Sequence, residues 1–390
     1  MFEPYKLYVT SGQQLARMME DKNVNNLIFK ISQLDSRIAN FHVRGRKSGP
    51  QSLLFYNGCG GYGDQIMTWP VVKLLAQMGF EVHVLTEPGN EQCWWGFPWI
   101  KSVLTLPMEY EVFKLFTYHC IFEYLSNFDE HPGQLHPVDC MLEKIGIEHL
   151  AVAPELKKIE PVFNRTEIGQ ALQVKKEKTI GIYQLSASQG YRSLAPDQSI
   201  FVLQRLANTF PHVHWIALFD EFNPKEYAEM AKELKLDNVE VKCFEYIRAL
   251  WALAKMSAVI VSPDSMMVHV AGVLDIPCVS YWGATSPQSR MKYYTNQTTV
   301  FHRESCPLSP CHFSGATFPK YCPPSEKRTK CDAMMSISAD EIVEACRKVL
   351  TGVNKSKTDD KDSGNSDTAK SIGSVGRVGR PENSIPLPTS

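Results

Sequence analysis

A glycine-rich loop at residues 58–64, GCGGYGD, is the first stretch whose residue types suggest chemistry. It matches the G-x-G-x-x-G pattern of loops that hold the pyrophosphate of a dinucleotide. Glu87 lies near the spacing expected for an acid that binds a ribose hydroxyl. Asp64, however, follows the last glycine directly and would repel a pyrophosphate at a helix N-terminus. The loop alone leaves three interpretations open: Asp64 caps a helix, the loop binds a dinucleotide, or Asp64 is a catalytic acid.

A second candidate site is the stretch SPDSMMVHVAGVLDIPCVSYWGATSPQSR, residues 262–290. Its polar groups follow two predicted strands, at the strand ends where open α/β sheets bind ligands. After the first strand, the backbone amides of a helix N-terminus would offer an anion site. The alternative, which is favoured for one loop taken alone, is a capped helix with a core histidine. The candidate residues are Asp264, Ser265, Met266, Met267, His269, Gly283 and Thr285.

Four of the eleven cysteines lie close together, at Cys306, Cys311, Cys322 and Cys331. Four thiolates can bind zinc in a tetrahedral site. The gaps of four, ten and eight residues between them differ from the paired C-x₂-C spacing of a convincing zinc site. Buried free thiols in a reducing compartment are therefore the favoured interpretation, and a structural zinc is the alternative.

Alternating strands and helices predict the elements that position these residues. An apolar strand at 52–58, a helix at 64–79 and a strand at 80–87 form a βαβ unit, which requires a parallel sheet. A second alternation begins at residue 179. Its predicted strands are 179–187, 213–220, 238–244, 258–262 and 277–283, and its predicted helices are 197–211, 224–235, 247–256 and 265–274. The sequence thus predicts two α/β, doubly wound domains.

The predicted domain organisation follows from these elements and from changes in composition. We expect an N-terminal extension at 1–50, an N-terminal Rossmann-like domain at 51–170 and a C-terminal one at 171–338. The second domain includes the cysteine-rich loop 306–331. A closing helix follows at 339–352. Residues 353–390 are polar and low in apolar residues, so we expect a disordered tail.

Charge and hydropathy narrow the classes of partner and compartment. The chain has 41 basic and 42 acidic residues among 390, so no nucleic-acid partner is expected. We find no signal sequence and no run of about 18 apolar residues, so we expect a cytoplasmic protein without a transmembrane segment. Contact with a membrane surface and the oligomeric state stay open.

Three stretches together resemble glycosyltransferase family 9, the ADP-heptose:lipopolysaccharide heptosyltransferases. PDSMMVHVAGVLDIPCVSYWGATSP is similar to the family's motif D-[ST]-G-x-x-H-x-A-A-x-x-x-x-P-x-x-x-x-[FY]-G-x-T-x-P. Met266 replaces the usual glycine and Gly272 the second alanine. GYGDQIMTWPVVKLL resembles the family's N-terminal motif, and QLSASQGYRSLAPDQ its donor-phosphate stretch. The matching positions are Gly63, Asp64, Pro70, Leu74, Arg192, Asp264, Ser265, His269, Ala271, Pro277, Gly283, Thr285 and Pro287.

The resemblance implies a GT-B fold, in which two Rossmann-like domains face each other across a cleft. The C-terminal domain would bind a nucleotide-sugar donor, and the N-terminal domain would bind a hydroxyl acceptor. Asp64 would be the general base of an inverting transfer, and Gly61 and Gly63 would let the backbone turn tightly beside it. Lipopolysaccharide is the family's usual acceptor, and a protein, another glycan and a modified nucleobase stay open as alternatives. The sequence identifies neither the base nor the sugar of the donor, and the departure at Met266 weakens the assignment of a heptose.

The resemblance also implies how the donor is held. Ser186, Ser188 and Arg192 would bind its diphosphate together with the residues of the 264–269 loop. Such a site stabilises the leaving group without metal, so no cofactor is expected. Two other functions stay open: an NAD-dependent oxidoreductase that uses the Gly58–Gly63 loop, and a non-catalytic protein that binds a sugar nucleotide or a glycan.

Overall fold

The computed structural model describes residues 8–10, 28–30, 43, 51–58, 61–122, 135–173, 179–219, 225–311 and 331–362. The chain divides into two units, 1–351 and 352–390. All that follows concerns the first unit, apart from the end of the last helix. Most of the predicted N-terminal extension lies outside the described residues, and so does the predicted tail beyond residue 362.

The N-terminal sheet has four parallel strands in the order β5-β4-β3-β7. These are β3 (Ser52–Asn57), β4 (Glu81–Thr86), β5 (Ile100–Thr105) and β7 (Tyr118–Phe122). Helix α3 (Tyr62–Gln77) connects β3 to β4 and completes the predicted βαβ unit. β3 is apolar along nearly its whole length because both faces of this sheet are covered.

A small sheet covers one face of these strands. It has the order β2-β1-β6, with β1 at Tyr8–Thr10, β2 at Ile28–Lys30 and β6 at Met108–Glu109. Helix α4 (Tyr110–Phe113) follows β6. Val9 and Phe113 are fully buried in one cluster with Leu54 and Tyr56 of β3. Helices α3 and α5 (Pro137–Lys144) belong to a second, larger hydrophobic cluster on the other face of the sheet. Leu53 and Phe55 of β3 belong to the same cluster.

The C-terminal sheet has six parallel strands in the order β10-β9-β8-β11-β12-β13. They are β8 (Thr179–Gln184), β9 (Val213–Leu218), β10 (Val239–Lys242), β11 (Val259–Pro263), β12 (Cys278–Trp282) and β13 (Gln297–Phe301). The first five were predicted. β13 was not, because its QTTVF sequence is more polar than the runs that marked the others.

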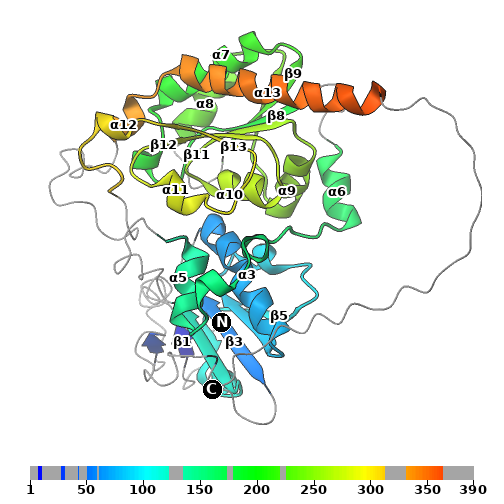
Figure 1. Cartoon of the computed structure of the whole chain (residues 1–390), viewed down its shortest axis with the longest axis vertical. Coiled ribbons are helices and arrows are strands. Elements are labelled where there is room, and N and C mark those ends of the chain that lie inside the picture. Colours follow the sequence, from blue (N-terminus) through cyan, green and yellow to red (C-terminus); the bar gives the residue numbers. More distant parts are fainter. Residues whose placement is uncertain are drawn as a thin grey trace, which may run out of the picture. The chain divides into compact units, whose positions relative to one another are not determined.

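Helices cover both faces of this sheet (Figure 1). One face packs against α7 (Pro196–Thr209), α8 (Lys225–Glu233) and α13 (Ala339–Asp362), and the other against α9 (Ile247–Lys255) and α10 (Met266–Val273). Alternate strand residues serve the two faces: Ile182 and Ile260 belong to the cluster with α10, whereas Tyr183 and Val261 belong to the cluster with α7. This is the doubly wound arrangement that the sequence predicted.

Shorter elements complete the described part of the chain. They are α6 (Arg165–Ala171), α11 (Pro287–Arg290), α12 (Asp332–Met335) and the 3₁₀ turns Glu91–Trp94, His149–Ala151, Pro154–Lys157, Gly190–Arg192 and Arg303–Ser305. The domain boundary that we placed at residue 170 falls within α6.

The start of α3 and the end of the last helix differ from the prediction. α3 begins at Tyr62 rather than Asp64 and continues through Pro70, so the proline lies inside the helix. The last helix continues to Asp362, ten residues beyond its predicted end at 352. The polar composition that suggested a tail at 353 is therefore compatible with further helical turns.

Helix α3 of the N-terminal half packs against α10 of the C-terminal half. Both helices belong to one hydrophobic cluster, in which the Trp69 and Trp251 rings meet edge to face at 5.7 Å. Buried charges also join the two halves. Asp139 accepts hydrogen bonds from Lys157, Lys292 and Tyr293, at 2.7, 2.8 and 2.6 Å. The N-terminal end of α3 is thereby held beside the carboxyl ends of the C-terminal strands.

Candidate active site

Asp64 is the third residue of α3, just inside the helix N-terminus. Gly61 is the N-cap residue and has no side chain with which to cap the helix. Its backbone instead hydrogen-bonds to the Asp64 carboxylate, which is one half of a capping box. A Cβ on Gly61 would lie 2.9 Å from Asp64 Oδ2. Glycine at position 61 therefore leaves room for the carboxylate, whose side chain is 32% exposed.

The surroundings of Asp64 make it a stronger base than an exposed aspartate. Burial raises its pKa, and the guanidiniums of Arg290 and Arg192 oppose that effect without cancelling it. The nearby carboxylate of Asp264 raises the pKa further. A carboxylate whose pKa is raised toward the working pH is better matched to accepting a proton.

The carboxyl ends of three adjacent strands bring the other predicted residues together. Asp264 follows β11 and is buried. Thr285, which follows β12, donates a hydrogen bond to Asp264 Oδ2 at 2.5 Å. Arg192, which follows β8, places Nη1 3.6 Å from the same oxygen. Burial alone would raise the pKa of Asp264, but the two arginines and Thr285 outweigh burial and lower it. Asp264 is therefore an ionised anchor.

The start of α10 carries a side-chain cap, which was the alternative interpretation of this stretch. Ser265 is the N-cap residue, and its Oγ accepts from the Met267 amide at 3.4 Å. Ser262 Oγ lies 2.9 Å from Ser265 Oγ. The Met267 side chain is fully buried, whereas Met266 is half-buried. The Met267 side chain therefore packs in the core. In this turn, the backbone amides at the helix N-terminus are the groups that suit an anion.

His269 connects the two sequence motifs. Its ring lies against Gly63, where a Cβ would meet His269 Cδ2 at 2.6 Å. His269 Nδ1 is 3.2 Å from the Tyr294 hydroxyl. Burial lowers the pKa of His269 to about 4, against the opposing effect of Asp264. The imidazole is therefore neutral at physiological pH and is placed to support the loop.

Gly272, which stands where the family motif has a second alanine, has a structural explanation. A Cβ at this position would overlap the ring of Tyr294. Tyr294 is the residue that contacts His269. The smaller residue therefore lets the tyrosine pack against α10 and reach the histidine.

The segment after β8 carries unsatisfied polar atoms. Ser186 Oγ and Arg192 Nε are both buried and have no hydrogen-bond partner within the described ranges. Arg192 Nη2 donates to Ser188 Oγ at 2.9 Å. Buried polar groups are rarely left unpaired without a reason, and a bound ligand is one such reason.

Gly283 lies beside the cysteine-rich segment. A Cβ on Gly283 would meet Met334 Cβ at 2.9 Å and Cys331 Sγ at 3.0 Å. Cys311 and Cys331 are buried, and Cys306 is partly exposed. Cys322 lies outside the described residues. In the part of the chain that the structure describes, no three His, Cys, Asp or Glu side chains group as metal ligands would. With Cys322 outside that part, the choice between free thiols and a structural zinc stays untested.

Arg290 is the residue that sequence reasoning missed. It ends the short helix α11, and its Nη1 lies 3.7 Å from Asp64 Oδ1. Its positive charge also lowers the pKa values of Asp264 and His269. The only signal in the sequence was a basic residue at the end of the second candidate stretch. Its partner is 226 positions earlier, and no local pattern indicates that pairing.

The residue behind the dinucleotide hypothesis is engaged elsewhere. Glu87, the candidate ribose ligand, is buried and accepts a hydrogen bond from Tyr56 Oη at 2.9 Å.

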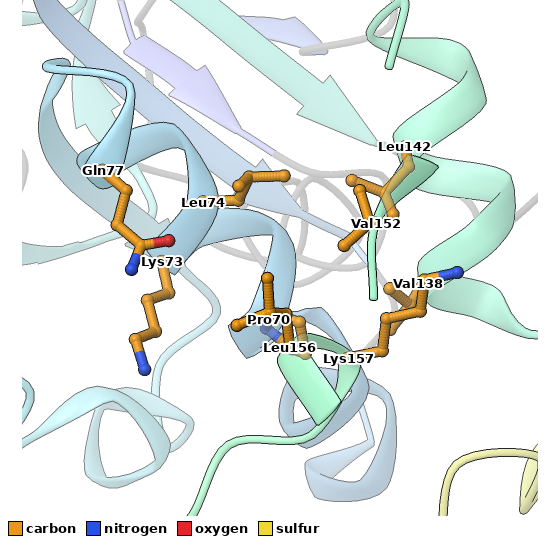
Figure 2. A pocket seen from close by; sticks show the side chains of 9 residues that line it. All are labelled: Pro70, Lys73, Leu74, Gln77, Val138, Leu142, Val152, Leu156 and Lys157. Carbon is orange, nitrogen blue, oxygen red and sulfur yellow. The ribbon is translucent and has the colours of Figure 1, made fainter. Parts of the chain in front are cut away.

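A separate hollow lies along α3, beyond the turn that carries Asp64 (Figure 2). Side chains from α3, from α5 and from the segment around Pro154–Lys157 line it. Six of the nine lining residues are apolar, and none is a predicted site residue. They are Pro70, Lys73, Leu74, Gln77, Val138, Leu142, Val152, Leu156 and Lys157.

Comparison with known proteins supports the fold and the resemblance. The model of glycosyltransferase family 9 (heptosyltransferase) matches residues 220–321. E. coli ADP-heptose lipopolysaccharide heptosyltransferase II has a similar structure, with a TM-score of 0.60 at 10% identity over 78% of this chain and 99% of that chain. A family 9 glycosyltransferase from Veillonella parvula gives 0.56 at 10% identity over 77% and 97%.

A third similar structure is TibC of enterotoxigenic E. coli, described as an iron-containing dodecameric glycosyltransferase. Its TM-score is 0.52 at 12% identity over 79% of this chain and 78% of that chain. The comparison with curated proteins found no significant match. Among the described residues, no helix is long and apolar enough to cross a membrane.

These findings define the class. The protein has the GT-B type of α/β fold, and its resemblance to glycosyltransferase family 9 is confirmed by the match over residues 220–321.

Proposed function

We propose that this protein transfers a sugar from a nucleotide-diphosphate donor to a hydroxyl acceptor with inversion, using Asp64 as the general base. One observation carries the proposal. Two motifs about 200 residues apart in the sequence form a single site, because Arg290 pairs with Asp64 and His269 packs on Gly63. If each motif only capped a helix, these contacts between the two motifs would not be expected.

In the proposed reaction, the acceptor oxygen attacks the anomeric carbon as its proton passes to the Asp64 carboxylate. The bond from the anomeric carbon to the donor's phosphate oxygen breaks, and the nucleoside diphosphate leaves with that electron pair. A single displacement through an oxocarbenium-like transition state inverts the anomeric configuration. The raised pKa of Asp64 favours its role as proton acceptor.

Groups at the carboxyl ends of β8, β11 and β12 would stabilise the leaving diphosphate. Arg192 brings a positive charge, and its unsatisfied Nε, like Ser186 Oγ, still has a hydrogen bond to make. The amide end of α10 adds partial positive charge. These groups supply the electrostatic stabilisation that the leaving group needs, so we propose a metal-independent transfer.

The names of the structural relatives suggest which substrate to test first. E. coli heptosyltransferase II is named for ADP-heptose and lipopolysaccharide, and TibC has been solved in complex with ADP-D-β-D-heptose. We therefore propose ADP-heptose as the first donor and a glycan hydroxyl as the acceptor class.

Thermal unfolding with a panel of nucleotides tests this proposal against the NAD alternative. The panel contains ADP, GDP, UDP, CDP, TDP and NAD, each with and without EDTA. Stabilisation by one nucleoside diphosphate that survives EDTA would support the proposal and identify the base of the donor. Stabilisation by NAD alone would contradict it. We do not expect that outcome, because Glu87, the candidate ribose ligand, is already hydrogen-bonded to Tyr56.

A further inference from the structure

We propose that Arg290 is a ligand of the donor's diphosphate and that Asp64 holds it in place while the site is empty. Binding of the donor would then draw Arg290 away from Asp64 and release the base. This inference rests on the proposed function and adds a residue and a coupling to it.

The contact between Arg290 and Asp64 is loose. The Nη1–Oδ1 distance of 3.7 Å is within salt-bridge range but beyond hydrogen-bond range. The Arg290 side chain is only 13% exposed, so its charge acts within the site rather than in bulk water. A long, partly shielded ion pair is weaker than a bidentate pair with phosphate. The guanidinium is therefore able to exchange one anion for another.

The charges of the site favour such an exchange. Two carboxylates, Asp64 and Asp264, face two guanidiniums, Arg192 and Arg290, so these four side chains sum to zero. A nucleoside diphosphate adds further negative charge. A guanidinium that turns from a carboxylate toward the phosphates brings positive charge to the group that carries the most negative charge.

Arg290 and Arg192 contact different carboxylates. Arg192 contacts Ser188 and Asp264. Arg290 ends helix α11 and lies beside Asp64, so its movement, rather than that of Arg192, would release the base. Within the described ranges, Arg290 is the only cation in salt-bridge distance of Asp64.

The exchange would prepare Asp64 for catalysis. The charged groups that act on Asp64 are Arg290 and Arg192, which favour its ionised form, and Asp264, which disfavours it. The neutral His269 ring lies beside it, against Gly63. Departure of Arg290 strengthens Asp64 as a proton acceptor when the donor has arrived, so donor binding and base activation are coupled.

Titration calorimetry with the best nucleoside diphosphate of the panel, and with inorganic pyrophosphate, tests the coupling. R290Q should weaken binding about 10–100-fold, the effect of losing a charge-assisted hydrogen bond. D64N should tighten binding severalfold because Arg290 no longer has to leave a carboxylate. In D64N/R290Q that gain should disappear. R290K should restore part of the affinity, and R205Q, in the exposed pair with Asp340, should bind like the wild type.

Each contrary result has a separate meaning. If R290Q binds as tightly as the wild type, Arg290 does not contact the diphosphate and the inference is wrong. If D64N tightens binding equally with and without Arg290, plain charge repulsion explains the effect and the coupling is wrong. If no nucleoside diphosphate binds the wild-type protein, the proposed donor site fails as well. R290K provides the same comparison if R290Q does not fold.

Discussion

The ring of His269 packs directly on the backbone of Gly63, so closely that a Cβ at residue 63 would lie 2.6 Å from Cδ2 and 3.2 Å from Nε2. Gly63 precedes Asp64 on α3, and His269 lies on α10, which follows the donor-side loop. Because the histidine ring fills the place of a side chain at residue 63, the two helices approach closely at this point. The spacing between the proposed base and the donor loop depends on that approach.

Replacement of Gly63 by alanine should therefore separate the helices. We expect G63A to lower the free energy of unfolding by about 1–3 kcal/mol, the usual range for overpacking, and to weaken nucleotide binding. Urea unfolding measures the first effect. G169A in α6 is the matched control, because nothing lies within 4 Å of a Cβ there, and it should be neutral or slightly stabilising. H269A combined with G63A should recover part of the loss, and a stable G63A would contradict this packing.

The buried imidazole of His269 should make the fold sensitive to acid. Its pKa in the folded chain is about 4, below the ordinary histidine value of about 6.5. The unfolded chain therefore takes up the proton first, and stability is lost as the pH falls from about 6.5 toward 4. The full loss is about 3 kcal/mol at about 1.4 kcal/mol per pKa unit. Urea unfolding at about pH 7.5 and pH 5 should show a smaller loss in H269Q than in the wild type. Equal losses would contradict the assignment.

The two strands that flank α3, the first five strands of the C-terminal sheet and the first motif could be predicted because their signals are local. The apolar runs at 52–58 and 258–262 match the bounds of β3 and β11 to within one residue. A strand that is buried on both faces is a continuous apolar run, so the sequence marks it directly. The start of α3 was missed by two residues because Gly61 has no capping side chain, so nothing in the sequence marks the turn that begins the helix.

The contacts that assemble the site could not be predicted. Arg290 and Asp64, like His269 and Gly63, meet only after both domains have folded and α3 has packed on α10. Nothing within a window of 10 to 20 residues carries that information. The family resemblance indicated Asp64 and Asp264 but said nothing of Arg290, whose position matches no motif residue.

The activity of the wild type should rise with pH through the raised pKa of Asp64, because only the carboxylate can accept the acceptor's proton. This rise is the acidic limb of the pH–rate profile. R290Q removes a positive charge that favours the carboxylate, so it should move the midpoint of the acidic limb upward by about one pH unit. D264N removes a negative charge and should move it downward. The pH dependence of kcat/KM for the donor measures both shifts, because it reports the free enzyme, in which Arg290 lies beside Asp64. An acidic limb that does not move in either variant would contradict the electrostatic role of these neighbours.

Arg192 should contribute to donor affinity rather than to the stability of the fold. R192Q removes the charge beside Asp264 and the hydrogen bond to Ser188, and we expect nucleoside-diphosphate binding to weaken about 10–100-fold. Calorimetry measures the change. R165Q, an exposed arginine on α6, is the control and should bind normally. Unchanged affinity in R192Q would remove Arg192 from the donor site.

The role of Asp64 as the base is the central claim, and the rate of sugar transfer from ADP-heptose by D64N tests it most directly. We expect turnover to fall about 10²–10⁴-fold, while the affinity for the nucleoside diphosphate is at least that of the wild type. D237N, which changes an exposed acid between α8 and β10, should keep wild-type turnover. If D64N transfers the sugar at the wild-type rate, Asp64 is not the base and the proposed mechanism is wrong.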